Sequence, residues 1–171
     1  MRYLARVFGV LGLLSVTCLV LGQAGATSAQ TILSSSATGL TGHSTAQMRL
    51  TDHPHHVLMG QVIIARQGDD RVQALSIAHV WDGVHRLRFD QAWADGVALP
   101  YQPIPRAGLA CAARSCRTTA VGVIFLSPAA FAHVQTHGLR ARLTGPSGAI
   151  DIAAPAALFR DAARMAQPGT D

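Results

Sequence analysis

The 171-residue chain has no lysine and no glutamate, so its 14 basic residues are all arginine and its 9 acidic residues are all aspartate. Aromatic residues are scarce, at 5% of the sequence, and charged residues make up only 13%. Beyond residue 29, the charges are 12 arginines and 9 aspartates, spread along the chain with no run of basic residues. Nucleic-acid binding requires a clustered basic face, so this charge pattern argues against a nucleic-acid partner.

Several catalytic motifs are also missing. The sequence has no G-x-S-x-G nucleophile elbow, no H-E-x-x-H zinc motif and no glycine-rich phosphate loop. Its adjacent carboxylates, Asp69-Asp70, are typical of a solvated turn and do not resemble the separated acid pair of a glycosidase. The sequence therefore favours a non-enzymatic protein and leaves a small hydrolase as the weaker alternative.

Residues 1–29 have the three-part order of a cleavable secretory signal peptide: two early arginines, an apolar segment and then small residues. The apolar segment, 7–22, is shorter than the roughly 20 residues of a membrane-spanning helix. Two cleavage sites, after Ala26 and after Ala29, have small residues one and three places before the cut. Of the two, cleavage after Ala29 is preferred. We expect a periplasmic or secreted protein with no stable membrane span after cleavage.

The chain has 3 cysteines, and one of them, Cys18, lies within the predicted signal peptide. Acylation of Cys18 is the alternative to cleavage, but the preceding residues lack the leucine and the small residue of a lipoprotein site. The remaining pair, Cys111 and Cys116, predicts a disulfide in an oxidising compartment. A redox dithiol usually has two intervening residues at a helix start, and this pair has four.

The mature chain fits a single domain in length. Residues 30–44 are rich in serine, threonine and glycine and predict a flexible lead-in. Residues 45–166 form the predicted β-rich domain, and 167–171 form a C-terminal tail.

Alternating or β-branched apolar runs predict about seven strands. The strongest local signal is a hairpin around Asp82-Gly83, because both residues accept positive φ. Prolines 100, 103 and 105 predict an edge strand or a loop. The predicted strands include 45–50, 57–66, 73–81, 84–89, 121–126, 139–143 and 149–153. The last two are predicted to pair as a second hairpin around Gly145-Pro146-Ser147-Gly148.

Two short helices are predicted in the C-terminal half. The first begins at Ser127-Pro128, a cap followed by a first-turn proline, and ends near Gly138. The second runs from about Pro155 to Met165. The predicted fold class is therefore mainly β (α+β): a small antiparallel β-sandwich or open barrel with two helices.

A series of landmarks follows one order along the C-terminal half: Gly96-Val97-x-Leu99, Cys111, Cys116, 121–126, Leu126-Ser127-Pro128, Gly138-Leu139, Gly145, Gly148, Ile150, Ile152 and Phe159. This order resembles that of invasion-associated locus B proteins, which are small exported bacterial β-proteins. This resemblance implies an envelope or secreted protein without a recognised catalytic centre. The chain departs from the family pattern because it has no cysteine in the first half after the signal peptide, where the family generally has more.

Histidine is the residue type that most invites a chemical interpretation. His53, His55 and His56 crowd one predicted turn, and imidazole is a common ligand of zinc and copper. His133 and His137 lie four apart on the first predicted helix, which places both rings on one face. The alternative for the first group is a solvated turn, and for the second a helix C-terminus that favours a cationic ring.

These observations favour an exported, non-enzymatic accessory or binding module. The expected partner is an unknown envelope protein or a small ligand. The first alternative is a periplasmic transition-metal-binding protein that uses the turn of His53, His55 and His56, with zinc or copper as its only expected cofactor.

The intact mass of protein purified from its native host tests both the signal peptide and the disulfide. We expect a chain that begins at Gln30 and is lighter by two hydrogens than the fully reduced form, with a cross-linked peptide containing Cys111 and Cys116. A chain that begins at Met1, or two cysteines that both react with a thiol reagent before reduction, would contradict these expectations.

Overall fold

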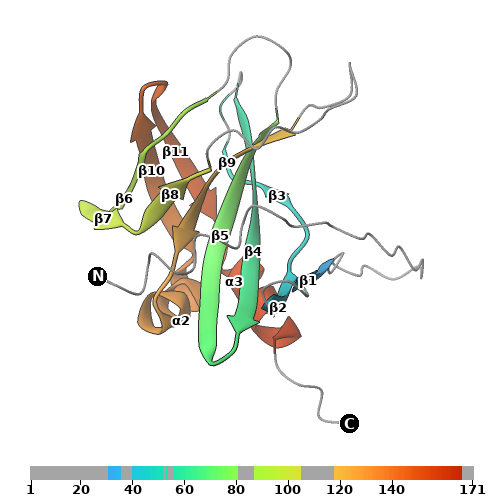
Figure 1. The fold of residues 1–171 in the computed structure, drawn as a ribbon. Helices are drawn as coiled ribbons and strands as arrows, with labels where there is room; N and C mark the ends of the chain where they lie inside the picture. The colour runs from blue at the N-terminus through green and yellow to red at the C-terminus, as the bar shows by residue number, and fades with distance from the viewer. Residues whose placement is uncertain are drawn as a thin grey trace, which may run out of the picture.

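The computed structural model describes residues 31–35, 40–51, 53, 56–80, 87–104 and 118–166. Over these residues the protein is mainly β, with two antiparallel sheets and two helices (Figure 1). The prediction of a mainly β, α+β protein built as a small sandwich or open barrel is confirmed.

The larger sheet has seven strands in the order β1-β2-β4-β5-β9-β8, and β3 also pairs with β4. At its centre, β4 and β5 pair antiparallel over 11 residues each, and Gly68 takes a φ of 60° in the turn between them. A positive φ suits glycine, which has no Cβ. The strands are β1 (Thr31–Ser35), β2 (Leu40–Ser44), β3 (Met48–Arg49), β4 (Val57–Gln67), β5 (Asp70–Val80), β8 (Tyr101–Pro103) and β9 (Thr118–Phe125).

The smaller sheet has four strands in the order β11-β10-β6-β7. Its strands are β6 (Gln91–Ala94), β7 (Val97–Leu99), β10 (Leu139–Gly145) and β11 (Gly148–Ala154). The β10–β11 hairpin pairs from Leu139↔Ala154 to Gly145↔Gly148, as the sequence predicts. Side chains alternate along β10 and β11, so one face of each strand is buried and the other exposed.

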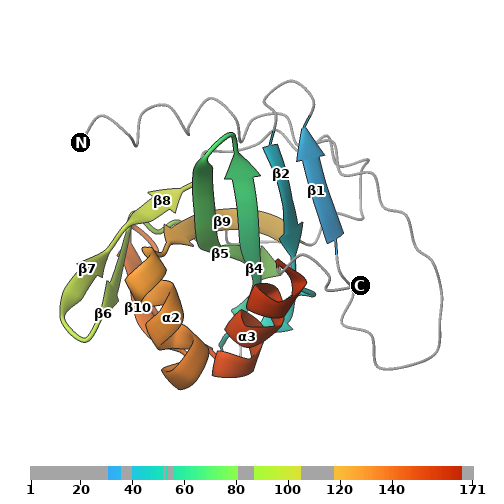
Figure 2. The same cartoon turned by 90° about the horizontal axis from the view of Figure 1, so that it is seen from below.

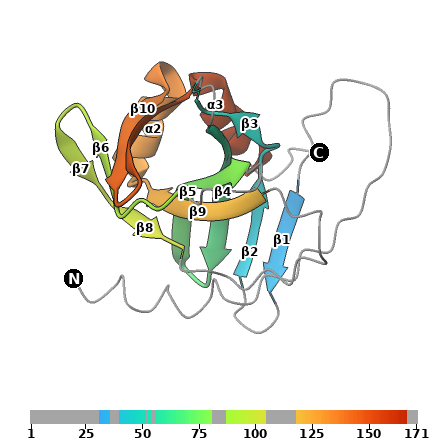
Figure 3. The same cartoon turned by 90° about the horizontal axis from the view of Figure 1, so that it is seen from above.

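Hydrogen bonds between backbone groups join the two sheets around a common core. The amide of Ala153 on β11 donates to the carbonyl of Leu50, just after β3, at 2.7 Å. At another seam, the amide of Phe125 on β9 donates to the carbonyl of Pro100, which links β7 to β8, at 2.9 Å. Figure 3 shows the resulting ring of strands from above. This arrangement matches an open barrel with the two sheets as its walls.

The two helices lie next to each other at the lower end of the barrel (Figure 2). They are α2 (Pro128–His137) and α3 (Ala156–Met165), and both agree with the predicted positions. The Ser127 hydroxyl accepts a hydrogen bond from the amide of Ala130 at 3.2 Å, which caps α2 as its sequence predicts. The rings of Phe131 and Phe159 meet edge to face at 6.1 Å between the helices.

The core lies between the inner faces of the sheets and the helices. Its most enclosed side chains have less than 2% of their surface exposed. Phe159 on α3 is the largest of them and is fully buried. The other large apolar members are Leu58, Val62, Leu75, Ile77, Ile124 and Leu143.

The structure differs from the predicted lead-in of residues 30–44. Thr31–Ser35 and Leu40–Ser44 form β1 and β2, which extend the larger sheet beyond β4. Gly42 allows this close approach, because a Cβ at that position would lie 2.4 Å from the carbonyl oxygen of Ile64. The exposed edge of β4 supplies backbone partners that local composition did not indicate.

The hairpin predicted around Asp82-Gly83 is wrong in its pairing. Both edges of β5 are occupied, by β4 and by β9, and residues 87–89 are not in a strand. The turn residues themselves lie outside the described residues. A hairpin of the same type forms instead at Asp95 and Gly96, whose φ angles are 49° and 77°. Local turn chemistry identified the type of turn, but tertiary pairing decided where it forms.

Replacing Phe159 with alanine tests the inferred core. We expect a loss of about 3–5 kcal/mol in the free energy of unfolding, because the change leaves a cavity where the helices meet the sheets. Denaturant unfolding of the mature chain measures it. Val97→Ala is the control, since that side chain is 65% exposed and its loss should cost far less. Equal losses in the two variants would contradict the assignment of the core.

Candidate functional site

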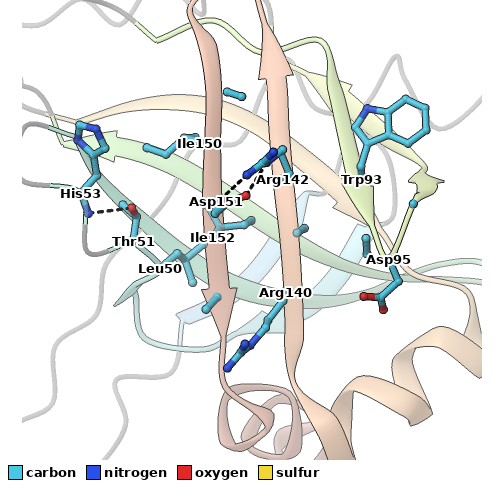
Figure 4. A pocket seen from close by; sticks show the side chains of 15 residues that line it. Leu50, Thr51, His53, Trp93, Asp95, Arg140, Arg142, Ile150, Asp151 and Ile152 are labelled. Carbon is cyan, nitrogen blue, oxygen red and sulfur yellow. Dashed lines mark hydrogen bonds and ion pairs between the residues drawn. The ribbon is translucent and has the colours of Figure 1, made fainter.

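An open groove of about 920 Å³ runs over the outer face of the smaller sheet. Strands β10 and β11 form its floor, the β6–β7 hairpin lines one side, and the segment after β3 lines the other (Figure 4). Ligand sites in proteins commonly occupy about 300–1,000 Å³, so this volume suits a small molecule. The polar and aromatic residues that line it are Thr51, His53, Trp93, Asp95, Arg140, Arg142 and Asp151.

The alternation of β10 places these residues in the groove. Leu139, Ala141 and Leu143 point into the core, while Arg140 and Arg142, which lie between them, are exposed. Each strand residue faces the side opposite to its neighbours, so burial of the apolar set fixes both arginines on the outer face. The groove is therefore built on a hydrogen-bonded sheet, which holds its side chains in a fixed register.

One row of side chains crosses the groove from strand to strand. Trp93 on β6 is the register partner of Arg142 on β10, which is in turn the partner of Asp151 on β11. The Trp93 side chain is held from its own strand, because its Nε1 donates to Oε1 of Gln91 at 3.2 Å. Trp93 remains 37% exposed, which leaves an aromatic surface on one side of the groove.

Arg142 and Asp151 form a two-pronged ion pair. Nε donates to Oδ1 at 2.8 Å and a terminal guanidinium nitrogen donates to Oδ2 at 2.8 Å. The hydrogen bond from Arg142, with the attraction of its charge, lowers the pKa of Asp151 below its ordinary value. The same pairing raises the pKa of Arg142. The two charges neutralise each other at the centre of the groove.

The other charged side chains of the groove, Arg140 and Asp95, have no ion pair among the described residues. Arg140 projects from β10, and Asp95 projects from the turn between β6 and β7 (Figure 4). The groove therefore offers one cation, one anion and one aromatic surface to a ligand. Arginine suits planar anionic groups such as carboxylates, and an aspartate accepts hydrogen bonds from hydroxyl groups.

A histidine cluster lies beside one end of the groove. The rings of His53 and His56 stack with centres 4.8 Å apart, and the ring of His56 is 5.7 Å from that of His79. His79 lies on β5 and is only 3% exposed, while His53 is exposed and also lines the groove. The fold thus brings together two of the histidines predicted from the turn and a third from a distant strand.

His55 lies outside the described residues. Among those described, no three histidine, cysteine or aspartate side chains already stand in metal-holding geometry. The zinc or copper site predicted at His53, His55 and His56 thus remains a prediction, and the structure adds His79 as a neighbour. The sequence does not indicate that His79 joins this cluster, because 23 positions separate it from His56 and only the β4–β5 pairing brings the two close.

The second predicted pair lies on helix α2. The rings of His133 and His137 stack at 4.3 Å, and both residues are exposed. Nδ1 of His137 lies 3.2 Å from the carbonyl oxygen of His133, a contact that occupies one ring nitrogen. His137 is the last residue of the helix, where the helix dipole favours a cation. The arrangement fits this structural role, and metal binding here remains a prediction.

The hydrolase alternative needs a hydroxyl within reach of an imidazole. In the groove, Thr51 and His53 are joined by a turn contact in which the backbone amide of His53 donates to the Thr51 hydroxyl at 3.1 Å. This contact uses the backbone and not the ring, so it does not activate the hydroxyl. Cys111 and Cys116, predicted to form a disulfide, lie outside the described residues, as does the predicted signal peptide.

No family model, curated protein or solved structure matches the chain. The resemblance to invasion-associated locus B proteins therefore remains a prediction. Within the described part of the chain, neither helix has the length and apolar character needed to cross a membrane.

The central ion pair predicts the pH behaviour of Asp151. Its pKa in the folded protein is below the unfolded value, so the pair stabilises the fold above the unfolded pKa, and this contribution is lost as pH falls through the folded pKa. Arg142→Gln should raise the pKa of Asp151 towards its ordinary value of 3.8, as measured by NMR of its carboxyl carbon. Arg164→Gln, which removes the partner of Asp161, is the control. An Asp151 pKa that is the same in all three proteins would contradict the pairing.

Proposed function

We propose that this protein is an exported, non-enzymatic binding module that holds a small ligand in the groove of the smaller sheet. The observation that carries the proposal is the presence, in one groove of about 920 Å³, of an exposed tryptophan and two charged side chains that form no ion pair with any residue the structure describes. The export part of the proposal is supported by the signal-peptide pattern of residues 1–29.

The chemistry of the lining favours an acidic saccharide. A sugar ring has a flat C–H face that packs on an aromatic side chain such as Trp93. A carboxylate on the sugar would pair with Arg140, and its hydroxyl groups would donate to Asp95. Uronic acid units carry all three features, and the pairing of β6 with β10 places Trp93 and Arg140 on neighbouring strands.

The ion pair at the centre of the groove supports binding in another way. Arg142 and Asp151 satisfy each other through two hydrogen bonds, so a ligand need not neutralise either charge. Their side chains remain more than half exposed, and free lone pairs of the carboxylate can still accept hydrogen bonds from hydroxyl groups. The pair therefore gives the groove a polar floor that stays ordered before the ligand arrives.

Binding of a short hyaluronan oligosaccharide, compared with a neutral cello-oligosaccharide of equal length, tests the proposal. We expect the acidic sugar to bind and to change Trp93 fluorescence, and the neutral sugar to bind at least about tenfold more weakly because it lacks the charge-assisted bond to Arg140. Isothermal titration calorimetry of the mature chain measures both affinities.

Variants assign the binding to the groove. Trp93→Ala and Arg140→Gln should each weaken binding of the acidic sugar, while Arg66→Gln on β4, which does not line the groove, should leave it unchanged. Equal affinity for the two sugars would refute the acidic ligand class. An affinity lost equally with Arg66→Gln would show that binding follows overall charge and not the groove.

A further inference from the structure

The histidine cluster described above draws its members from two parts of the fold. His53 and His56 come from the segment before β4, and His79 comes from β5 near the end of its pairing with β4. The register places His79 opposite Leu58, two residues after His56. The position of His79 against the turn is thus fixed by the longest strand pairing in the described sheets and not by local sequence.

The distances between the rings suit coordination of a single ion. An imidazole nitrogen lies about 2.0–2.1 Å from a bound zinc ion, so two rings on one tetrahedral zinc have centres about 5 Å apart. The observed spacings of 4.8 Å and 5.7 Å lie on either side of that value. His56 therefore contacts each of the other two rings at a spacing that suits a pair of zinc ligands, and only side-chain rotation is needed to bring the three rings around one ion.

We propose that His53, His56 and His79 bind one transition-metal ion, with zinc as the ion tested. Imidazole is a good ligand for zinc and copper, and water can complete the four-coordinate site. This set differs from the one predicted along the turn, because a buried strand residue takes the place assigned to His55. The zinc tests can fail or succeed separately from the sugar-binding proposal, because none of them alters Trp93 or Arg140.

The three rings must reorient slightly to coordinate the ion. The planes of His53 and His56 are 25° apart, so their nitrogens do not yet converge on one point. His53 is exposed and can turn its ring about two side-chain torsions, while His79 is held on β5. We therefore expect the ion to order the side chain of His53 while the strands stay in place.

Zinc binding by tag-free mature protein is the direct test, by calorimetry and by competition with a chromogenic chelator. We expect one equivalent of tightly bound zinc in the wild type. His56→Ala and His79→Gln should each weaken it by at least about tenfold, the scale seen when even the support of a metal ligand is removed. His55→Ala and the double variant His133→Ala/His137→Ala should keep the wild-type affinity.

A second measurement uses the unaltered chain, so it does not depend on whether His79→Gln folds. Imidazole NMR signals of His79 should shift and saturate at one equivalent of zinc. Cobalt in place of zinc should give the visible spectrum of a tetrahedral nitrogen and oxygen site, without a thiolate charge-transfer band.

Three results would overturn the proposal. The first is the absence of stoichiometric zinc binding by the wild type. The second is loss of binding in His55→Ala together with unshifted His79 signals, which would place the ion on the turn alone. The third is loss of the bound equivalent of zinc in the double variant His133→Ala/His137→Ala, which would place the ion on α2.

Discussion

The antiparallel pairing of β4 with β5 is the interaction on which the rest of the structure depends. Eleven residues of each strand are in register from Val57↔Val80 to Gln67↔Asp70. This ladder carries fully buried side chains such as Leu58 and Leu75, and its outer edges accept β2, β3 and β9. Because the side-chain period of a strand is two, a slip of one residue would turn these core residues outward. The register therefore fixes both the core and the seams to the smaller sheet.

The same ladder supports two candidate sites, one for a metal ion and one for a small ligand. On β5, it holds His79 against the segment of His53 and His56, where rigidity favours coordination of an ion. The ladder also supports the floor of the groove, because the carbonyl of Leu50 accepts a hydrogen bond from the amide of Ala153 on β11. His53 touches both regions, since it lines the groove and stacks on His56. An ion that turns this ring would also change one end of the groove.

The candidate groove could be found only in part from the sequence. The alternation of residues 139–143 and 149–153 predicted a hairpin with one exposed face, and Arg140, Arg142 and Asp151 fall on that face. No local pattern indicated that Trp93 would lie beside Arg142, because β6 pairs with β10 across a separation of about fifty residues. The low aromatic content of the sequence does not point to a ligand groove, but one exposed tryptophan, Trp93, lines the groove that the fold forms.

Local chemistry by itself determined the two helices, the β10–β11 hairpin and the mainly β class. Serine and proline at a helix start, glycine at its end and period-two apolar runs act within a few residues. The tertiary structure alone decided which turn became the β6–β7 hairpin, that residues 31–35 and 40–44 form strands, and that His79 joins His56. These features arise where strand edges and buried faces that are far apart in the sequence meet. The residues next to each strand or side chain carry no information about which distant segment it will contact.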